Sequence, residues 1–176
     1  MMKLNISVKS ITIRLKINLS YVRIIPREAK MRLSSTQKSY LAGFLDGDGS
    51  IYVRLKPNDT YKYGFQVSPY IIFFQSSKEQ KNFERLCSLI GFGYMRKRKD
   101  GIMEFTIGRK EDIRKFLSMV KPYVVLKRRQ VSLMEEILKF KDTVKNKNDF
   151  EKLMELIDSF REINYSKKRI KRSLTP

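Results

Sequence analysis

Leu41-Ala42-Gly43-Phe44-Leu45-Asp46-Gly47-Asp48-Gly49 is the stretch of this sequence that decides its fold. Its small residues, Ala42, Gly43 and Gly47, leave one face of a helix with almost no side chains, so that a second helix can approach closely. Asp48 follows that face and is bracketed by glycines, which places its carboxylate at a tight turn. If two copies of the chain pack about a two-fold axis, two Asp48 carboxylates converge, and carboxylates with backbone carbonyls are ligands that Mg2+ prefers.

The sequence on both sides of this stretch predicts an α+β fold. A helix begins at Ser34, Ser35 or Thr36, any of which can cap it, and ends at about Asp46, where the glycines break it. From residue 51 apolar and polar side chains alternate, which is typical of a half-buried strand with a cationic face. The same reasoning predicts a second strand at 61–74, a helix at about 77–90, strands at 94–99 and 102–107, and helices at about 111–120, 128–141 and 149–163.

Local signals refine three of these elements. Pro69 lies within the second strand and implies a bulge or an edge there, because proline cannot donate a hydrogen bond to a sheet. Ser77 and Gln80 form a capping box for the helix that follows. The dipeptide Asp100-Gly101 is typical of a tight turn, so the next two strands are expected to form a hairpin.

The chain is strongly basic, with 38 lysine and arginine residues against 18 acidic residues and a formal net charge of +20. Such an excess favours nucleic acid or an anionic membrane surface as the partner. No apolar run approaches the roughly 20 residues needed to span a bilayer, which favours nucleic acid.

Two basic ends flank one expected domain at residues 34–165. Residues 1–33 hold eight basic residues and one acid. That composition is typical of a transit peptide, although a dispensable, poorly ordered extension, with Met31 as an internal start, fits equally well. Residues 166–176 hold five basic residues and no acid, and we expect a disordered arm that contacts phosphates. The domain itself keeps 25 basic residues against 17 acidic ones, so it is basic without its ends.

The absence of histidine and the presence of a single cysteine narrow the kinds of site that the chain can build. The chain has no histidine, which excludes an imidazole base, a histidine-ligated zinc and an HNH-type nuclease site. Its lone cysteine, Cys87, lies in an apolar helical stripe and is expected to pack in the core. The acidic turn does not fit an EF-hand, because with Gly49 at the invariant glycine position Phe44 and Leu55 replace the first ligand and the final glutamate. Carboxylates that hold a hard metal ion remain for hydrolysis.

Residues 41–50 resemble the signature of the LAGLIDADG homing endonucleases, and the predicted order of elements is similar to the αββαββα fold of that family. The resemblance covers about residues 39–138 and is greatest to single-motif, homodimeric enzymes encoded in group I introns of algal organelles. The resemblance continues in three further stretches, which are Lys-Pro-Asn at 56–58, Ile-Gly-Phe-Gly-Tyr at 90–94 and Pro-Tyr followed by basic residues at 122–130. It implies a curved antiparallel sheet that binds DNA, extra C-terminal helices and a two-fold dimer, because one motif needs a second copy.

The resemblance also implies roles for individual residues. Asp48 corresponds to the metal-binding acid, and Gly47 to the residue whose carbonyl helps to coordinate the ion, which we expect to be Mg2+. Gln75 matches a polar residue that positions active-site water. Lys127 matches a basic residue near the scissile phosphate. These assignments make Asp48, Gln75 and Lys127 the candidate catalytic set.

One position departs from the pattern of the close relatives. They carry a basic residue just after the second strand, where this sequence has Glu79 with Lys78 and Lys81 beside it, so the residue that completes the basic set is left open. Asp46 does not match the catalytic acid of the family, and we interpret it as structural. We expect the dimer interface to be formed by Leu41, Ala42, Gly43, Leu45 and Asp46.

The polar face of the predicted sheet is the candidate surface for reading DNA. An ordinary solvated face mixes charges, whereas this face holds four basic residues and one acid. Arginine suits guanine, glutamine suits adenine and glutamate suits the cytosine amine. A strand of about 10 residues covers about 10 base pairs, so two protomers would read a pseudo-palindromic site of about 20 base pairs. The candidates are Tyr52, Arg54, Lys56, Asn58, Tyr61, Gln66, Ser68, Tyr70, Arg96, Arg98, Glu104 and Thr106.

The sequence therefore predicts an Mg2+-dependent, site-specific, double-strand DNA endonuclease that promotes intron mobility. Its expected partners are double-stranded DNA and a second copy of the chain, with neither a membrane nor a small-molecule substrate. An RNA-binding group I intron maturase is the alternative, and a DNA-binding regulator without catalysis is a second, but the candidate catalytic set favours the nuclease. The resemblance implies an organelle, and the basic N-terminal extension supports an organellar location. The chloroplast is favoured over the mitochondrion, but both are left open.

Overall fold

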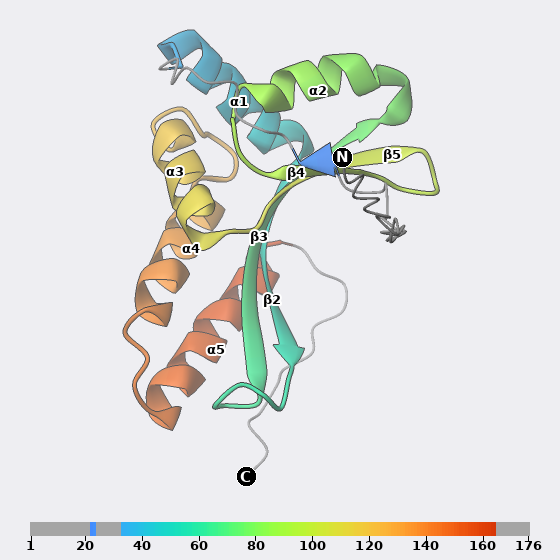
Figure 1. The fold of residues 1–176 in the computed structure, drawn as a ribbon. Helices are drawn as coiled ribbons and strands as arrows, with labels where there is room; N and C mark the ends of the chain where they lie inside the picture. Colours follow the sequence, from blue (N-terminus) through green and yellow to red (C-terminus); the bar gives the residue numbers. More distant parts are fainter. Residues whose placement is uncertain (1–21, 24–32, 165–176) are drawn as a thin grey trace, which may run out of the picture.

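The computed structural model describes residues 22–23 and 33–164 of the chain. Its elements run helix, two strands, helix, two strands, helix and then two further helices (Figure 1). They are α1 (Ser35–Asp48), β2 (Gly49–Pro57), β3 (Phe65–Ser76), α2 (Gln80–Ser88), β4 (Tyr94–Lys97), β5 (Ile102–Ile107), α3 (Lys110–Val120), α4 (Arg128–Lys141) and α5 (Lys147–Ile163). The predicted α+β class, with an αββαββα order and extra C-terminal helices, is confirmed.

A further strand of two residues, β1 (Val22–Arg23), precedes this series and pairs with β4. The sheet order is β1-β4-β5-β3-β2, and every neighbouring pair is antiparallel. Apart from β1 and Leu33, the expected extension at 1–33 lies outside the described residues, as does the expected basic arm at 166–176. No helix in the described ranges has both the length and the apolar character needed to cross a bilayer.

The β2–β3 hairpin is the longest part of the sheet. Its register is unbroken over all nine residues of β2, and Pro69 pairs with Val53 within it. The expected bulge at Pro69 is therefore wrong. The expected edge is present, because the pairing of β3 with β5 begins only at Ile71. A residue without an amide hydrogen is tolerated where β3 has a partner on one side only.

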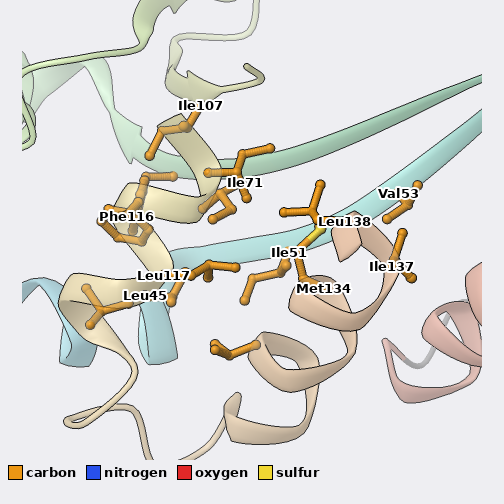
Figure 2. Close-up of a cluster of buried hydrophobic side chains, with 14 of the residues drawn as sticks. Leu45, Ile51, Val53, Ile71, Ile107, Phe116, Leu117, Met134, Ile137 and Leu138 are labelled. Carbon is orange, nitrogen blue, oxygen red and sulfur yellow. The ribbon is translucent and has the colours of Figure 1, made fainter. Parts of the chain in front are cut away.

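One face of the sheet carries the core, and the helices pack on that side (Figures 1 and 2). Alternate residues of β2 and β3 point into the core, and two of them, Ile51 and Ile71, are at most 1% exposed. They meet Leu45 of α1, Phe116 of α3 and Met134 of α4, all fully buried. Burying a side chain of this size contributes about 1.5–3 kcal/mol. The alternation therefore determines which face of the sheet remains for other contacts.

Both ends of α1 are set by local chemistry. The Ser34 hydroxyl accepts the amide of Gln37 at 3.2 Å, and the Gln37 side chain accepts the amide of Ser34 at 2.9 Å, which is a capping box. The helix continues through Asp48, two residues further than predicted, and passes directly into β2 at Gly49. A Cβ at Gly49 would lie 2.7 Å from the carbonyl oxygen of Leu45. Only glycine fits this junction.

The segment before α2 differs from the prediction. Ser77 and Gln80 do not form a capping box, because β3 extends as far as Ser76 and a 3-10 turn at Ser77–Glu79 follows it. The Ser76 hydroxyl accepts the amide two residues further on at 3.3 Å and so caps that turn, whereas α2 has no side-chain cap. The prediction for Cys87 is confirmed, since it is 1% exposed and burial raises the pKa of its thiol.

A salt-bridge cluster ties α3 to the residue after α4. Asp142 accepts hydrogen bonds from Lys110 and Arg114, each at 2.6 Å, and these bonds lower the pKa of the Asp142 carboxyl. A group with a depressed folded pKa contributes stability above its unfolded pKa, which for aspartate is about 3.9. That contribution is lost as the pH falls through the folded pKa.

We expect Asp142→Asn to lower the free energy of unfolding at neutral pH by about 0.5–1 kcal/mol, the upper part of the range for solvent-screened pairs. The difference from the unmodified protein should shrink in acid and at high salt, because both weaken the charge interaction. Urea unfolding curves from neutral to acid pH measure the effect. A difference that does not change with pH would show that the Asp142 charge is not its source.

Candidate nucleic-acid interface and active site

The exposed carboxylate of Asp48 lies at the C-terminal end of α1. The last carbonyls of a helix lack donors within the helix, so Gly47, one residue earlier, adds a carbonyl oxygen at the same end. Carboxylate and carbonyl oxygens are hard donors, which suit Mg2+ better than they suit a softer ion. Among the described residues no group of three or more acidic or cysteine side chains gathers to hold an ion. Asp48 and the carbonyl of Gly47 are therefore the candidate metal ligands at this end of α1.

Asp46, two residues before Asp48, binds the segment that leads into α4. Its Oδ2 accepts the backbone amides of Val125 and Leu126 at 2.7 and 3.1 Å, and its Oδ1 accepts that of Lys127 at 2.9 Å. In return, the Lys127 ammonium donates to the backbone carbonyl of Asp46. Burial lowers the pKa of Lys127, and the charges of Asp46 and Asp48 act in the opposite direction. The interpretation of Asp46 as structural is confirmed, and its contacts bring Lys127 to the end of α1.

Gln75 reaches the same end of α1 through the register of the sheet. β2 begins at Gly49, which pairs with Phe73, so Gln75, two residues further along β3, lies just beyond the start of β2. Its side-chain oxygen accepts the amide of Ser76 at 2.9 Å. Asp48 is the last residue of α1, Gln75 lies in β3 and Lys127 directly precedes α4. The fold brings these three candidate catalytic residues to one end of α1.

Glu79, at the position where the resemblance leads one to expect a basic residue, is used within its own segment. Its Oε2 accepts a hydrogen bond from the side-chain amide of Asn82 at 2.8 Å. The neighbouring Lys78 and Lys81 are exposed. Both lysines therefore present their positive charge to solvent close to the end of β3, where the Glu79 carboxylate is already engaged.

The polar face of the sheet lies opposite the helices and carries the predicted DNA-contacting residues in facing pairs. These pairs are Tyr52 with Tyr70, Arg54 with Ser68, and Lys56 with Gln66. Arg54 and Lys56 are exposed. The rings of Tyr52 and Tyr70 lie 5.4 Å apart, and burial raises the pKa of Tyr52. The predicted facing of these residues is confirmed on both sides of Pro69.

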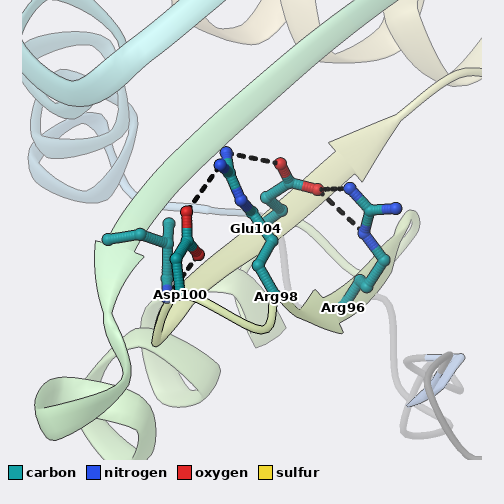
Figure 3. A network of polar contacts seen from close by, with 5 residues as sticks. Arg96, Arg98, Asp100 and Glu104 are labelled. Carbon is teal, nitrogen blue, oxygen red and sulfur yellow. Dashed lines mark hydrogen bonds and ion pairs between the residues drawn. The ribbon is translucent and has the colours of Figure 1, made fainter.

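A network of charges covers the same face on the β4–β5 hairpin (Figure 3). Glu104 is 8% exposed and accepts hydrogen bonds from Arg96 at 2.9 Å and from Arg98 at 3.3 Å. Arg98 also donates to Asp100 at 2.6 Å. Glu104 was expected to contact a base, but its carboxylate is engaged by two guanidinium groups. We therefore assign it to holding Arg96 and Arg98 in place.

The remaining predicted DNA-contacting residues differ in exposure. Ser68 and Thr106 are buried, at 9% and 4% exposure, so their contact with a base would require their neighbours to move. Asn58 and Tyr61 lie in the turn that joins β2 to β3, and Tyr61 is 46% exposed. Contact of these four residues with DNA stays a prediction.

The exposed side of α1 is not the side that the sequence predicts to form a dimer interface. Leu41, Ala42 and Leu45 are fully buried in the core of the protomer, so the prediction that they contact a second copy is wrong. With about 3.6 residues per turn, Gly43 and Gly47 lie on the opposite side of the helix, and both are exposed. A Cβ on either glycine would meet no atom within 4 Å.

Exposed apolar side chains adjoin these glycines. Tyr40, three residues before Gly43, shares their side of α1 and is 63% exposed; Tyr40, Gly43 and Gly47 are termed the glycine face below. Val125 and Leu126 are 70% and 75% exposed, and Asp46 ties their backbone to the same helix. Of the five residues expected at the interface, Gly43 is exposed, whereas the carboxylate of Asp46 is used within its own chain.

Comparisons with known proteins agree with this geometry. A family model described as LAGLIDADG endonuclease matches residues 41–141. The chain is 32% identical over 131 residues to the DNA endonuclease I-CreI of Chlamydomonas reinhardtii, which covers 74% of this chain and 80% of that protein. It is 33% identical over 101 residues to the DNA endonuclease I-CvuI of Chlorella vulgaris, which covers 57% and 63%. A crystal structure of I-CvuI in complex with the I-CreI target matches with a TM-score of 0.72 and 29% identity, over 77% of this chain and 86% of that one.

The fold, the cationic polar face and the acid at the end of α1 define an enzyme that acts on nucleic acid. The chain belongs to the LAGLIDADG endonuclease family. The family and the enzyme class predicted from the sequence are thereby confirmed.

The contact between Asp46 and residues 125–127 is the feature of the site that the sequence analysis missed. The acceptor and its donors lie 79 to 81 positions apart in the chain. The donors are backbone amides, which every residue except proline carries, so no residue type marks them. The only signal in the sequence is an acid that the family pattern does not use for catalysis.

We expect Asp46→Asn to slow DNA cleavage by about 100-fold with little change in DNA binding, because the variant loses an acceptor oxygen and the segment that carries Lys127 shifts. The free energy of unfolding should fall by about 1–3 kcal/mol, since a partly buried amide loses its acceptor. Single-turnover cleavage and equilibrium binding of the same duplex separate the two effects.

The control for this prediction is Lys127→Met, alone and combined with Asp46→Asn. If Asp46 acts by positioning Lys127, the double variant should be no slower than Lys127→Met, because both changes remove the same contribution. Losses that add would show that the two residues act independently.

Proposed function

We propose that the chain is a Mg2+-dependent homing endonuclease that cuts both strands of a long, pseudo-palindromic DNA site as a symmetric homodimer, and so promotes the mobility of an intron. The observation that carries this proposal is the exposed Asp48 directly after the glycine face of α1. An acid that can hold a metal ion and a surface that admits a second helix occur on one element. Crystal structures of I-CvuI with DNA targets in the presence of Mg or Ca support DNA as the substrate and a divalent cation as the cofactor.

The chemistry follows from the residues at the end of α1. Asp48 and the carbonyl of Gly47 would hold the ion, which neutralises charge on a phosphodiester as it is hydrolysed. Lys127 brings a positive charge to the same end and would stabilise the charge that develops on the phosphate. The Gln75 side chain would orient a water molecule through hydrogen bonds.

A second copy completes the site in this proposal. Helices that meet through glycines can approach backbone to backbone. A two-fold axis through the glycine face brings two Asp48 carboxylates together, because Asp48 follows Gly47 directly. Such packing would also cover exposed apolar surface at Tyr40, Val125 and Leu126.

The polar face of the sheet would lie along the DNA. β3 has 12 residues and spans about 40 Å, the length of about 12 base pairs. Exposed Arg54 and Lys56, and the arginines held by Glu104, would offer donors to base edges and phosphates. We further propose a chloroplast location, supported by the resemblance to enzymes encoded in algal organelle introns.

We expect Asp48→Asn to abolish cleavage while largely sparing DNA binding, because an amide holds Mg2+ far less well than a carboxylate does. Purified protein and a randomised duplex library are incubated with Mg2+, and the cut ends are sequenced. EDTA should stop the unmodified protein, and added Mg2+ should restore cleavage. Cut ends produced by Asp48→Asn would contradict the role given to this carboxylate.

We expect Gly43→Arg to leave the protomer folded but to prevent dimerisation and cleavage. A Cβ at position 43 meets no atom within 4 Å, and glycine inside a helix is less favourable than other residues by up to about 1 kcal/mol, so Tm should not fall. Analytical ultracentrifugation should detect a monomer in place of a dimer. The matched control is Ser159→Arg, which adds the same charge to an exposed position of α5 and should remain an active dimer. A Gly43→Arg protein that dimerises and cuts would overturn the proposed interface.

A further inference from the structure

Within the part of the chain that the structure describes, the distal half of the β2–β3 hairpin has no third strand beside it. β5 pairs with β3 only from Ile71 onward, so residues 52–57 and 65–70 form a two-stranded ribbon. A ribbon of two strands is marginally stable in water unless a helix or further strands pack on it. Eight of the twelve predicted DNA-contacting residues nevertheless lie on this ribbon or in its turn. Their placement depends on what supports the ribbon.

The tip of the ribbon docks on the junction between α4 and α5 (Figure 1). The Tyr63 hydroxyl donates to the carbonyl oxygen of Lys145 at 3.0 Å, and the Lys62 ammonium donates to the same oxygen at 3.2 Å. The Tyr63 ring stacks on Phe150 of α5, with 4.9 Å between centroids and 24° between planes. Phe150 is 5% exposed, so the ring that receives Tyr63 is fixed in the core.

The turn at the tip is also ordered within itself. The Asn58 side-chain oxygen accepts hydrogen bonds from the backbone amide and the hydroxyl of Thr60 at 3.1 and 2.7 Å. The backbone amide of Asn58 donates to the carbonyl of Gly64 at 2.8 Å. Lys141 of α4 adds a second anchor by donating to the carbonyl of Val67 at 2.9 Å. Because the turn is closed by its own hydrogen bonds, it moves as a unit, and its anchors determine where that unit lies.

We propose that the contact of Tyr63 with the α4–α5 junction determines specificity, by fixing the hairpin tip that reads the outer base pairs of each half-site. Tyr63 and Phe150 are positioning residues in this proposal, since they act through the turn that Tyr63 anchors. Productive base contacts require side chains held within about 0.5 Å, a tolerance that an unsupported ribbon does not meet. The inference rests on the proposed function, because it takes the polar face as the DNA-binding surface.

Selection of bound duplexes from a randomised library tests this inference. The library is bound to the unmodified protein, to Tyr63→Phe, which removes only the hydroxyl, and to Phe150→Leu, which removes the ring stack. Base preference at the outer pairs should fall by about tenfold in Phe150→Leu, the discrimination of one good base contact, and by less in Tyr63→Phe. Preference at the inner pairs should not change. The matched control is Phe160→Leu, the same change at a 1% exposed residue about 15 Å further along α5.

Hydrogen exchange of the free protein provides a second readout. Amides at 58–64 should exchange about tenfold faster in Phe150→Leu, which frees the tip locally, and at the unmodified rate in Phe160→Leu. Unchanged base preference in both tip variants would overturn the inference, as would a loss of preference that Phe160→Leu shares. Neither readout requires cleavage. A protein that selects DNA but never cuts it would contradict the proposed function and leave the test of Tyr63 intact.

Discussion

The junction at Gly49 constrains the rest of this structure. α1 becomes β2 without an intervening loop, and the backbone of Leu45 occupies the space that a Cβ would need. Because side chains alternate along a strand, this junction determines which residues of β2 face the helices, and the register extends that choice to β3 and β5. Asp48 is adjacent to the junction, so the acid and the strands that carry the polar face belong to one rigid connection.

Signals carried by neighbouring residues were enough to predict most of the elements, although not β1 or the 3-10 turn before α2. The alternation in β2, the cap at Ser34 and the bounds of α4 follow from spacing within one segment. The small residues of α1 were also recognised, but the interface was assigned to the wrong side of the helix. Leu41 and Leu45 are four residues apart and therefore lie together on the core side. The helical spacing of these two leucines was enough to place the interface on the opposite side of α1.

Contacts between distant segments could not be predicted in the same way. Asp46 binds backbone amides and Tyr63 binds a backbone carbonyl, and such groups occur at nearly every position. The sequence shows that Glu104 is an acid among bases, but only the folded sheet shows that two arginines engage its carboxylate. These contacts decide which polar residues are free to meet a ligand, and they depend on tertiary placement.

The proposed homodimer would have a consequence for the cell. In the proposed homodimer each copy contributes one Asp48, so a solitary chain would be inactive. When copies are scarce and the pair dissociates, the amount of active enzyme rises with the square of the chain concentration, by mass action. The proposed contact between two glycine faces would then set the chain concentration below which little enzyme is active. At low expression, dissociation of the pair would by itself limit cutting of the genome.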